Sequence, residues 1–258
     1  MLYGLPKIHK PNFAENFKFR PIFAAYNTPS FSIAKFLVPI LAPLTKNEYT
    51  VENSTQFVTE ICEFPDADKY YMASFDVESL FTNIPLQETV NICVDSLFGQ
   101  SKTFLNFTKD LFKELLTLAV KCTFFIFDGK YFEQVEGLGM GLPLGPTFAN
   151  AFMCHHEIDW LGQCPVEFKP VLYRRYIDDC FLLFRDESHV ELFHSYLNSK
   201  HPNIKFTYER ENNRELSFLD INVRRNVSSF DTSVFRKPTF TGLGLSYFSY
   251  IRSHTQSV

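Results

Sequence analysis

The stretch Tyr176-Ile177-Asp178-Asp179, followed by the apolar run at residues 180–184, decides the fold of this 258-residue chain. An aromatic and an apolar residue precede two adjacent carboxylates. The pattern predicts a strand, a tight turn that carries both acids, and a second strand. Adjacent carboxylates repel each other, and burying them without a cation is costly. A turn that forces them together therefore indicates a divalent metal site.

A third acid lies upstream in a matching context. Asp76 follows the apolar residues 70–75, which predict another strand that ends at a carboxylate. If the two strands are neighbours, Asp76, Asp178 and Asp179 converge, and such oxygen-only ligands suit Mg²⁺ or Mn²⁺ rather than zinc. Two such ions could lower the pKa of an attacking hydroxyl and stabilise the leaving oxygen of a phosphoryl transfer. Each acid alone fits a solvated turn or a helix cap, and only their combination favours the metal site.

The composition is that of an ordinary globular chain, with 45% hydrophobic and 21% charged residues. No apolar run approaches the roughly 20 residues that span a bilayer, and the N-terminus lacks a signal pattern. The six cysteines show no CxxC spacing, which favours a reducing, intracellular setting. His155-His156, near Cys154 and Cys164, match no common zinc spacing, so we expect no metal site there.

The charge distribution favours a polyanionic partner although the net charge is only −4. Six basic residues and one acidic residue precede Asn47, and five basic residues and one acidic residue lie from Arg224 onward. Basic ends around an acidic centre suit a protein that holds a nucleic acid outside and metal ions inside. Charge blocks are also common on solvated faces, so the pattern supports this interpretation without deciding it.

Helices and strands interleave along the chain, and antiparallel hairpins dominate, so the pattern predicts an α+β fold. Helices are expected at residues 29–44, 55–63, 85–98, 108–121, 146–161 and 189–199. Strands are expected at 17–26, 70–75, 123–127, 131–135, 204–209, 216–225 and 232–236, and a loop at 2–12. In the helix at 108–121, the spacing predicts a buried stripe of Leu111, Leu115, Leu118 and Ala119.

Residues 137–145 form a Gly-rich loop before a predicted helix, with bare backbone at Gly139, Gly141 and Gly145. Glycines let a chain approach a base pair or a sugar closely, although a tight structural turn would use them as well. Lys7, Lys10 and Arg20 are candidate triphosphate contacts, and an arginine suits a bidentate phosphate clamp.

Together these residues resemble a reverse transcriptase, specifically of the Penelope-like retroelement family. The motifs fall in order over nearly the whole chain. They are two fingers motifs at residues 5–11 and 19–22, three palm motifs at 74–85, 137–150 and 173–179, the primer grip at 218–223 and the start of the thumb at 235–239.

The resemblance implies a right-hand polymerase with an antiparallel palm sheet packed on helices and a partial fingers subdomain. Residues 1–70 would be the fingers portion, 71–225 the palm with inserted fingers helices, and 226–258 the start of the thumb. Asp76 and Asp178 would be the principal metal ligands, joined by the Val77 carbonyl, with Asp179 in support.

The resemblance also assigns the substrate contacts. Lys7 and Arg20 would hold the triphosphate, with Met140 and Gly141 beside the nucleotide. Met140 stands where many reverse transcriptases carry glutamine. Phe81 would lie beneath the sugar and leave no room for a 2′-hydroxyl, which favours deoxynucleotides. The primer grip would be formed by Phe218, Leu219 and Asp220. Lys205 is a candidate general acid for the pyrophosphate, although a surface lysine is the favoured interpretation.

The implied function is an RNA-directed DNA polymerase core that transfers nucleotides to a primer 3′-hydroxyl with two Mg²⁺ or Mn²⁺ ions. Its partners would be an RNA or DNA template with a DNA primer and deoxynucleoside triphosphates, with no membrane, in the nucleus. The chain opens inside a fingers motif and ends soon after the thumb begins. The alternative is therefore a catalytically inactive truncated remnant that at most binds nucleic acid. An RNA-dependent RNA polymerase is a third interpretation, against which Phe81 argues.

Overall fold

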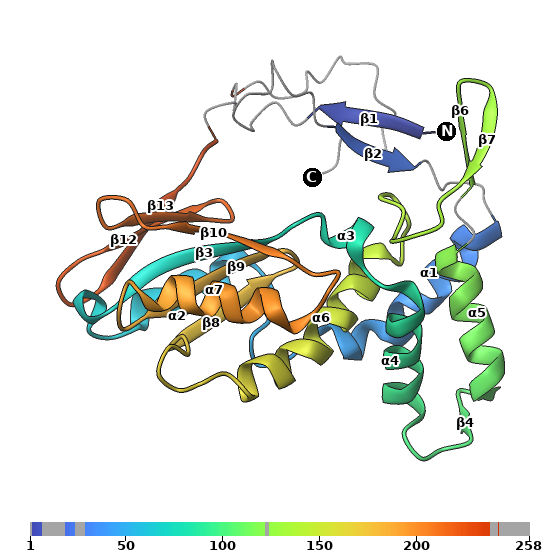
Figure 1. The fold of residues 1–258 in the computed structure, drawn as a ribbon, viewed down its shortest axis with the longest axis horizontal. Helices are drawn as coiled ribbons and strands as arrows, with labels where there is room; N and C mark the ends of the chain where they lie inside the picture. The colour runs from blue at the N-terminus through green and yellow to red at the C-terminus, as the bar shows by residue number, and fades with distance from the viewer. Residues whose placement is uncertain (1, 7–18, 24–28, 122–123, 238–241, 243–258) are drawn as a thin grey trace.

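A four-stranded antiparallel sheet forms the centre of the computed structural model, which describes residues 2–6, 19–23, 29–121, 124–237 and 242. The strand order is β10-β3-β9-β8 (Figure 1). The strands are β3 (Tyr71–Val77), β8 (Leu172–Tyr176), β9 (Asp179–Phe184) and β10 (Phe206–Arg210). The α+β architecture predicted from the sequence is confirmed.

Strand β9 is apolar from Cys180 to Phe184 because both faces of the sheet are covered there. Side chains alternate between the faces of a strand, so a strand buried on both sides has a continuous apolar run. Cys180 and Leu182 belong to the core on the side of α6 (Gly145–Gly162) and α7 (His189–Lys200), whereas Phe181 and Leu183 belong to a second core on the opposite side.

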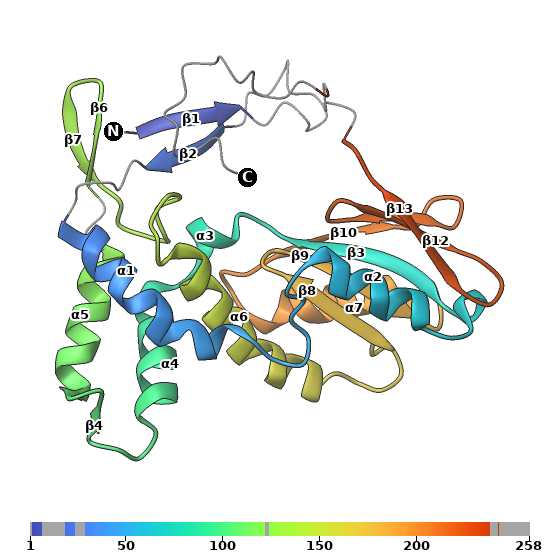
Figure 2. The ribbon, with the colours of Figure 1, turned by 180° about the vertical axis from the view of Figure 1, so that it is seen from behind.

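That second core lies between the sheet and two further elements. Helix α2 (Ser54–Glu63) contributes Phe57 and Ile61 to it. A three-stranded antiparallel sheet covers the rest, formed by β11 (Glu215–Phe218), β12 (Ile221–Arg225) and β13 (Phe230–Val234). The two views of the fold place α2 and this sheet together at one end of the molecule (Figures 1 and 2).

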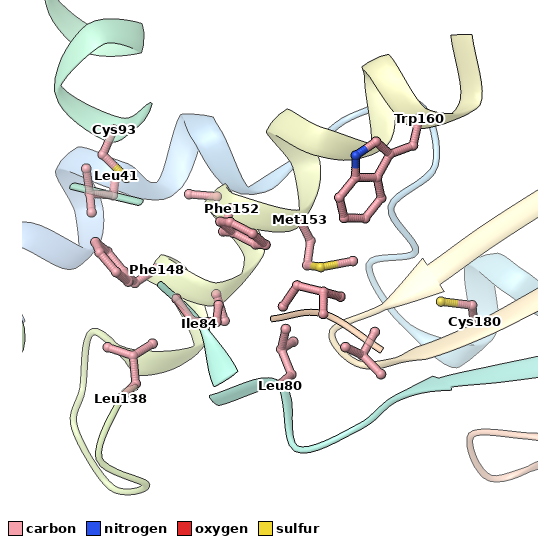
Figure 3. Packing of buried hydrophobic residues seen from close by; sticks show 14 of the residues in the cluster. Leu41, Leu80, Ile84, Cys93, Leu138, Phe148, Phe152, Met153, Trp160 and Cys180 are labelled. Atoms are coloured by element: carbon pink, nitrogen blue, oxygen red, sulfur yellow. The ribbon is translucent and has the colours of Figure 1, made fainter. Parts of the chain in front are cut away.

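Helix α6 joins the central sheet to a helical layer at the other end. This layer consists of α1 (Pro29–Leu41), α4 (Leu86–Phe98) and α5 (Lys109–Lys121). Figure 3 shows Phe148 and Phe152 of α6 among side chains such as Leu41 and Cys93, and Met153 and Trp160 further along the same helix. Each fully buried side chain of this size contributes about 1.5–3 kcal/mol. The helix is buried on most sides, so the site is built against a rigid element.

Shorter elements complete the fold. Three hairpins are formed by β1 (Leu2–Pro6) with β2 (Phe19–Phe23), β4 (Thr103–Phe104) with β5 (Phe107–Thr108), and β6 (Phe124–Phe127) with β7 (Lys130–Glu133). Helix α3 (Leu80–Asn83) follows β3, and 3-10 turns cover Ala42–Thr45 and Ala67–Lys69. None of the helices in the described part of the chain is both long and apolar enough to cross a membrane.

One sequence expectation is wrong, and a second is wrong in part. Residues 2–6 form a strand rather than a loop, because they pair with β2 across an intervening segment whose length hides the partnership. In α5 the buried residues are Phe112, Leu116, Ala119 and Val120. Of the predicted stripe, Ala119 is buried and Leu115 packs against the core, whereas Leu111 and Leu118 are about half exposed. Both sets have helical spacing, and the aromatic ring of Phe112, packed against those of Phe98, Phe104 and Phe107, selects the one that faces the core.

Candidate active site

The register of the sheet brings the predicted acids together. Asp76 lies directly opposite Asp179 in the β3–β9 ladder, and the Val77 N–H donates to the Asp178 carbonyl at 3.0 Å. Opposed residues of an antiparallel pair lie about 5 Å apart at Cα and project from the same face. That face is the one packed on α2 and the three-stranded sheet. Side chains alternate along a strand, so Asp76 lies on the same face as Met72, which belongs to the second core. Asp76 and Asp179 therefore share one end of this face, and Asp178 of the adjoining loop lines the same cavity.

The sequence predicts Asp76 at the end of its strand and both Asp178 and Asp179 on the turn, and the structure differs slightly. Asp76 is the penultimate residue of β3, and Asp179 is the first residue of β9. Only Asp178 lies in the loop, which consists of residues 177 and 178 between the paired Tyr176 and Asp179.

Ile177 adopts a positive φ of 58° in this two-residue loop. The first position of such a loop takes positive φ in type II′ turns, where glycine is the usual residue. A β-branched side chain in this region is strained, at a cost of about 1–3 kcal/mol. The surrounding structure must therefore hold the turn that carries Asp178.

The acids open onto a cavity of about 690 Å³. Phe81, Met140 and the turn at Leu219 and Asp220 line the same cavity. Its acidic lining residues, among those described, are Glu52, Asp76, Asp178, Asp179, Glu209 and Asp220, and its basic lining residue is Lys237. An anionic substrate would be repelled from such a cavity unless cations or further basic groups entered it.

The donor set of the cavity fits hard divalent cations. The lining contains carboxylates and backbone oxygens but no imidazole among the described residues. Its thiol, Cys180, is fully buried beside the Tyr173 hydroxyl at 3.4 Å, and burial raises the pKa of this thiol well above its usual range. A thiol that stays protonated is a poor zinc ligand. Oxygen donors remain, which are the ligands that Mg²⁺ and Mn²⁺ prefer.

The Gly-rich loop is clamped against the segment that follows β3. The Leu138 N–H donates to the Phe81 carbonyl at 2.6 Å. Gly137 has φ +69°, and a Cβ there would lie 2.3 Å from the Thr82 carbonyl oxygen. At the start of α6, a Cβ on Gly145 would lie 3.7 Å from Cε1 of Phe81. The half-buried Phe81 ring is thus placed between the acids and the first turn of α6.

The paired strands β1 and β2 meet the same loop. Met140 forms a parallel bridge with Ile22 of β2, the strand that contains Arg20. The backbone of Arg20 pairs with Leu5, but its side chain and all of Lys7 lie outside the described residues.

The proposed primer grip is a tight turn between β11 and β12. Phe218 is 3% exposed and packs against Phe57 and Phe181, with ring centroids 4.8 and 5.7 Å away. Leu219 has φ 55°, and the Asp220 carbonyl accepts the Phe235 N–H at 2.8 Å. Phe218 therefore anchors the turn, while Leu219 and Asp220 are presented to the cavity.

Lys205 does not line the cavity. Its Nζ donates to the carbonyls of Asn198 and His201 at 2.7 and 3.2 Å, at the C-terminal end of α7. A lysine in this position satisfies terminal carbonyls and opposes the helix dipole. The general-acid interpretation of Lys205 is not supported by this geometry.

A second cluster of ligand-type side chains lies away from the cavity and was not expected from the sequence. The carboxylate of Glu88 lies 2.9 Å from Nε2 of His156 and 3.2 Å from Nε2 of His201. The Asn203 N–H donates to Nδ1 of His201 at 3.1 Å, so neutral His201 carries its proton on Nε2 and cannot offer that atom to a metal. Burial lowers the pKa of His156. The cluster is best described as a hydrogen-bonded clamp between α4, α6 and the end of α7.

Glu157 is absent from the sequence expectations, and Arg175 appears there only as part of the third palm motif, although both side chains are buried. The sequence signal that could have predicted this pair is the acidic residue Glu157 inside an apolar helix that also contains Met153 and Trp160. A buried charge of this kind requires a partner.

A profile of the family described as reverse transcriptase (RNA-dependent DNA polymerase) matches residues 8–210. The chain belongs to the reverse transcriptase family.

Solved structures with a similar fold include telomerases, which this reverse transcriptase resembles at low sequence identity. Telomerase from Candida tropicalis in complex with a fragment of telomeric RNA has a TM-score of 0.61 at 12% identity, over 93% of this chain and 45% of that one. Telomerase from Candida albicans in complex with a telomeric RNA fragment has a TM-score of 0.57 at 13% identity, over 83% and 44%. The reverse transcriptase chain thus spans about half the length of these structures. A comparison with curated proteins found no match.

The clamp on the Gly-rich loop can be tested with two glycines of nearly equal φ. Gly129, at φ +70°, has open space around its Cα, so Gly129→Ala should cost about 1 kcal/mol from backbone strain alone. Gly137→Ala adds a clash with the Thr82 carbonyl, and we expect it to cost about 2–4 kcal/mol. Urea unfolding measures both free energies, and equal losses would contradict the close approach at Gly137.

Proposed function

We propose that this reverse transcriptase is the RNA-directed DNA polymerase core of a Penelope-like retroelement. It extends a DNA primer on an RNA or DNA template with deoxynucleoside triphosphates. The observation that carries the proposal is the β3–β9 register, which places Asp76 opposite Asp179, with Asp178 in the adjoining loop, at a cavity that also contains Phe81. The sequence motifs support the Penelope-like assignment and the subdomain boundaries at residues 1–70, 71–225 and 226–258. A nuclear location is part of the same proposal.

Asp76 and Asp178 hold two divalent ions in this proposal, with the Val77 carbonyl and Asp179 in support. When bound, such ions lower the pKa of the primer 3′-hydroxyl and stabilise negative charge on the departing pyrophosphate. The carboxylates position these charges, because Asp76 and Asp179 project from one face of two hydrogen-bonded strands and Asp178 lies in the adjoining loop. The acidic lining of the cavity also makes substrate binding dependent on cations.

The remaining residues position the substrates. Lys7 and Arg20 hold the triphosphate, beside Met140 and Gly141. Phe81 excludes a 2′-hydroxyl, since its backbone carbonyl is held by the Leu138 N–H and its ring lies against Gly145 at the start of α6. Leu219 and Asp220 contact the primer from a turn that Phe218 anchors in the core. Template and primer are held through backbone and duplex shape, so template sequence should matter little.

A non-catalytic nucleic-acid-binding remnant is the second candidate. The observation that favours it is charge: the net charge is −4, and the described cavity lining has six acidic residues against Lys237. Primer–template binding without extension in Mg²⁺ or Mn²⁺ would favour this candidate.

Loss of one acid tests the polymerase proposal. Asp178→Ala should lower extension of a DNA primer on an RNA template by on the order of 10³-fold, because several kcal/mol of charge stabilisation are lost. Asp110→Ala, at an exposed position in the first turn of α5, is the matched control and should extend normally. Gel-resolved primer extension with Mg²⁺, with Mn²⁺ and with a chelator measures the effect. Extension that survives Asp178→Ala would reject the assigned site.

The sugar filter gives an independent test. Phe81→Ala removes the ring that would meet a 2′-hydroxyl, so the ratio of ribonucleotide to deoxynucleotide incorporation should rise by about tenfold to a hundredfold. Phe125→Ala, in the β6–β7 hairpin, is the control aromatic substitution. Single-nucleotide kinetics with each sugar measures the ratio, and unchanged selectivity would remove Phe81 from this role.

A further inference from the structure

The guanidinium of Arg175 is fully buried, and each of its five N–H groups has an acceptor. Nη1 donates to Oδ1 of Asn150 at 2.7 Å and to the carbonyl of Ile177 at 2.9 Å. Nε and Nη2 donate to the two carboxylate oxygens of Glu157, and Nη2 also lies 3.4 Å from Sγ of Cys154. Arg175 thus connects helix α6 directly to Ile177, the strained residue of the acidic turn at residues 176–179.

The carboxylate of Glu157 is as completely satisfied as its partner. It is 1% exposed and also accepts hydrogen bonds from the Tyr173 hydroxyl at 2.9 Å and from Nδ2 of Asn47 at 3.1 Å. Burial alone would lower the pKa of Arg175, but the Glu157 carboxylate outweighs it and raises this pKa above its ordinary value. Arg175 therefore stays charged beside this carboxylate.

The backbone of Arg175 is fixed from the other side. Its N–H donates to the Tyr49 carbonyl at 2.8 Å, and its carbonyl accepts the Val51 N–H at 2.9 Å. The segment at residues 49–51 thus lies along the edge of β8, in parallel through a bridge at Thr50. The Arg175 side chain is thus held at both ends, by its paired backbone and by the buried Glu157 carboxylate, and it has few accessible rotamers. The Nη1–H group that donates to the Ile177 carbonyl is therefore preorganised.

Stability alone does not account for this pair. A buried ion pair is often no more stabilising than a well-packed apolar pair of similar volume, because both charges lose their hydration. An apolar pair would fill the same space between β8 and α6. It could not donate to the carbonyl of Ile177, whose positive φ sets the direction in which the chain presents Asp178.

We propose that the Arg175–Glu157 pair is a positioning device that holds the Ile177 carbonyl, and through it the Asp178 carboxylate, in the orientation that binds a divalent cation. The inference rests on the proposed polymerase function. Helix α6 begins at the Gly-rich loop, so the same pair also fixes the acidic turn relative to the residues beside the nucleotide.

The test measures metal binding without catalysis. Mn²⁺ is titrated into the full chain without nucleotide or primer, and the free ion is followed by its electron paramagnetic resonance signal. The decisive variant is the double substitution Arg175→Met/Glu157→Gln, which removes both charges and leaves an amide for Tyr173 and Asn47. Thermal unfolding of each variant is measured in parallel.

The matched control is Arg174→Met. Arg174 is the neighbouring residue of β8 on the opposite face, where it pairs with Glu60 of α2 and makes no contact with the turn. It therefore tests loss of a strand arginine and its ion pair without loss of the Ile177 hydrogen bond.

We expect the double variant to unfold near the wild-type temperature but to bind Mn²⁺ about tenfold more weakly, as loss of groups that orient metal ligands typically does. Arg174→Met should keep wild-type affinity. Wild-type Mn²⁺ affinity in a folded double variant would overturn the inference.

If the double variant does not fold, Arg175→Lys replaces it, because a lysine keeps the charge but lacks the fork that reaches both Glu157 and Ile177. Weaker Mn²⁺ binding by folded Arg175→Lys supports the inference, and unchanged binding overturns it.

Asp178→Ala separates this inference from the function on which it rests. If Asp178→Ala binds Mn²⁺ as the wild type does, the proposed metal site itself is wrong. If Asp178→Ala loses the ion while the Arg175 variants keep it, the site stands and only the positioning role fails.

Discussion

The antiparallel register of β3 and β9 is the constraint on which the site depends. A shift of one residue would move Asp76 to the opposite face and separate it from Asp179. The register is held by burial on both faces, since Phe181 and Leu183 face one core while Cys180 and Leu182 face the other. The same side chains that stabilise the sheet therefore determine where the carboxylates meet.

The rest of the fold makes the repulsion among these acids tolerable. The acids lie at the end of the sheet, beyond the apolar part of its face, where the cavity admits water and ions. Behind them, α6 supplies a rigid wall that reaches from the helical layer to β8. The elements that would contact substrates, including Phe81, Met140 and the turn at Leu219, all attach to this frame through backbone hydrogen bonds or buried rings.

Much of this arrangement could be predicted from sequence because it depends on local patterns. The hairpin at residues 176–179, the strand before Asp76 and the turn at Asp128-Gly129 each follow from alternation or turn chemistry. The buried face of α5 could not be predicted, since two stripes had helical spacing and only tertiary packing of Phe112 chose between them. The pairing of β1 with β2 and the contact between Arg175 and Glu157 were likewise out of reach, because they join segments that only the folded chain brings together.

The most direct measurement of the central claim is a crystal structure of the chain grown or soaked with Mn²⁺ and examined for anomalous scattering. The account predicts manganese peaks in the cavity about 2.0–2.6 Å from carboxylate oxygens of Asp76 and Asp178. A chain in which manganese avoids these acids, or binds only at Glu88 and its two histidines, would contradict it.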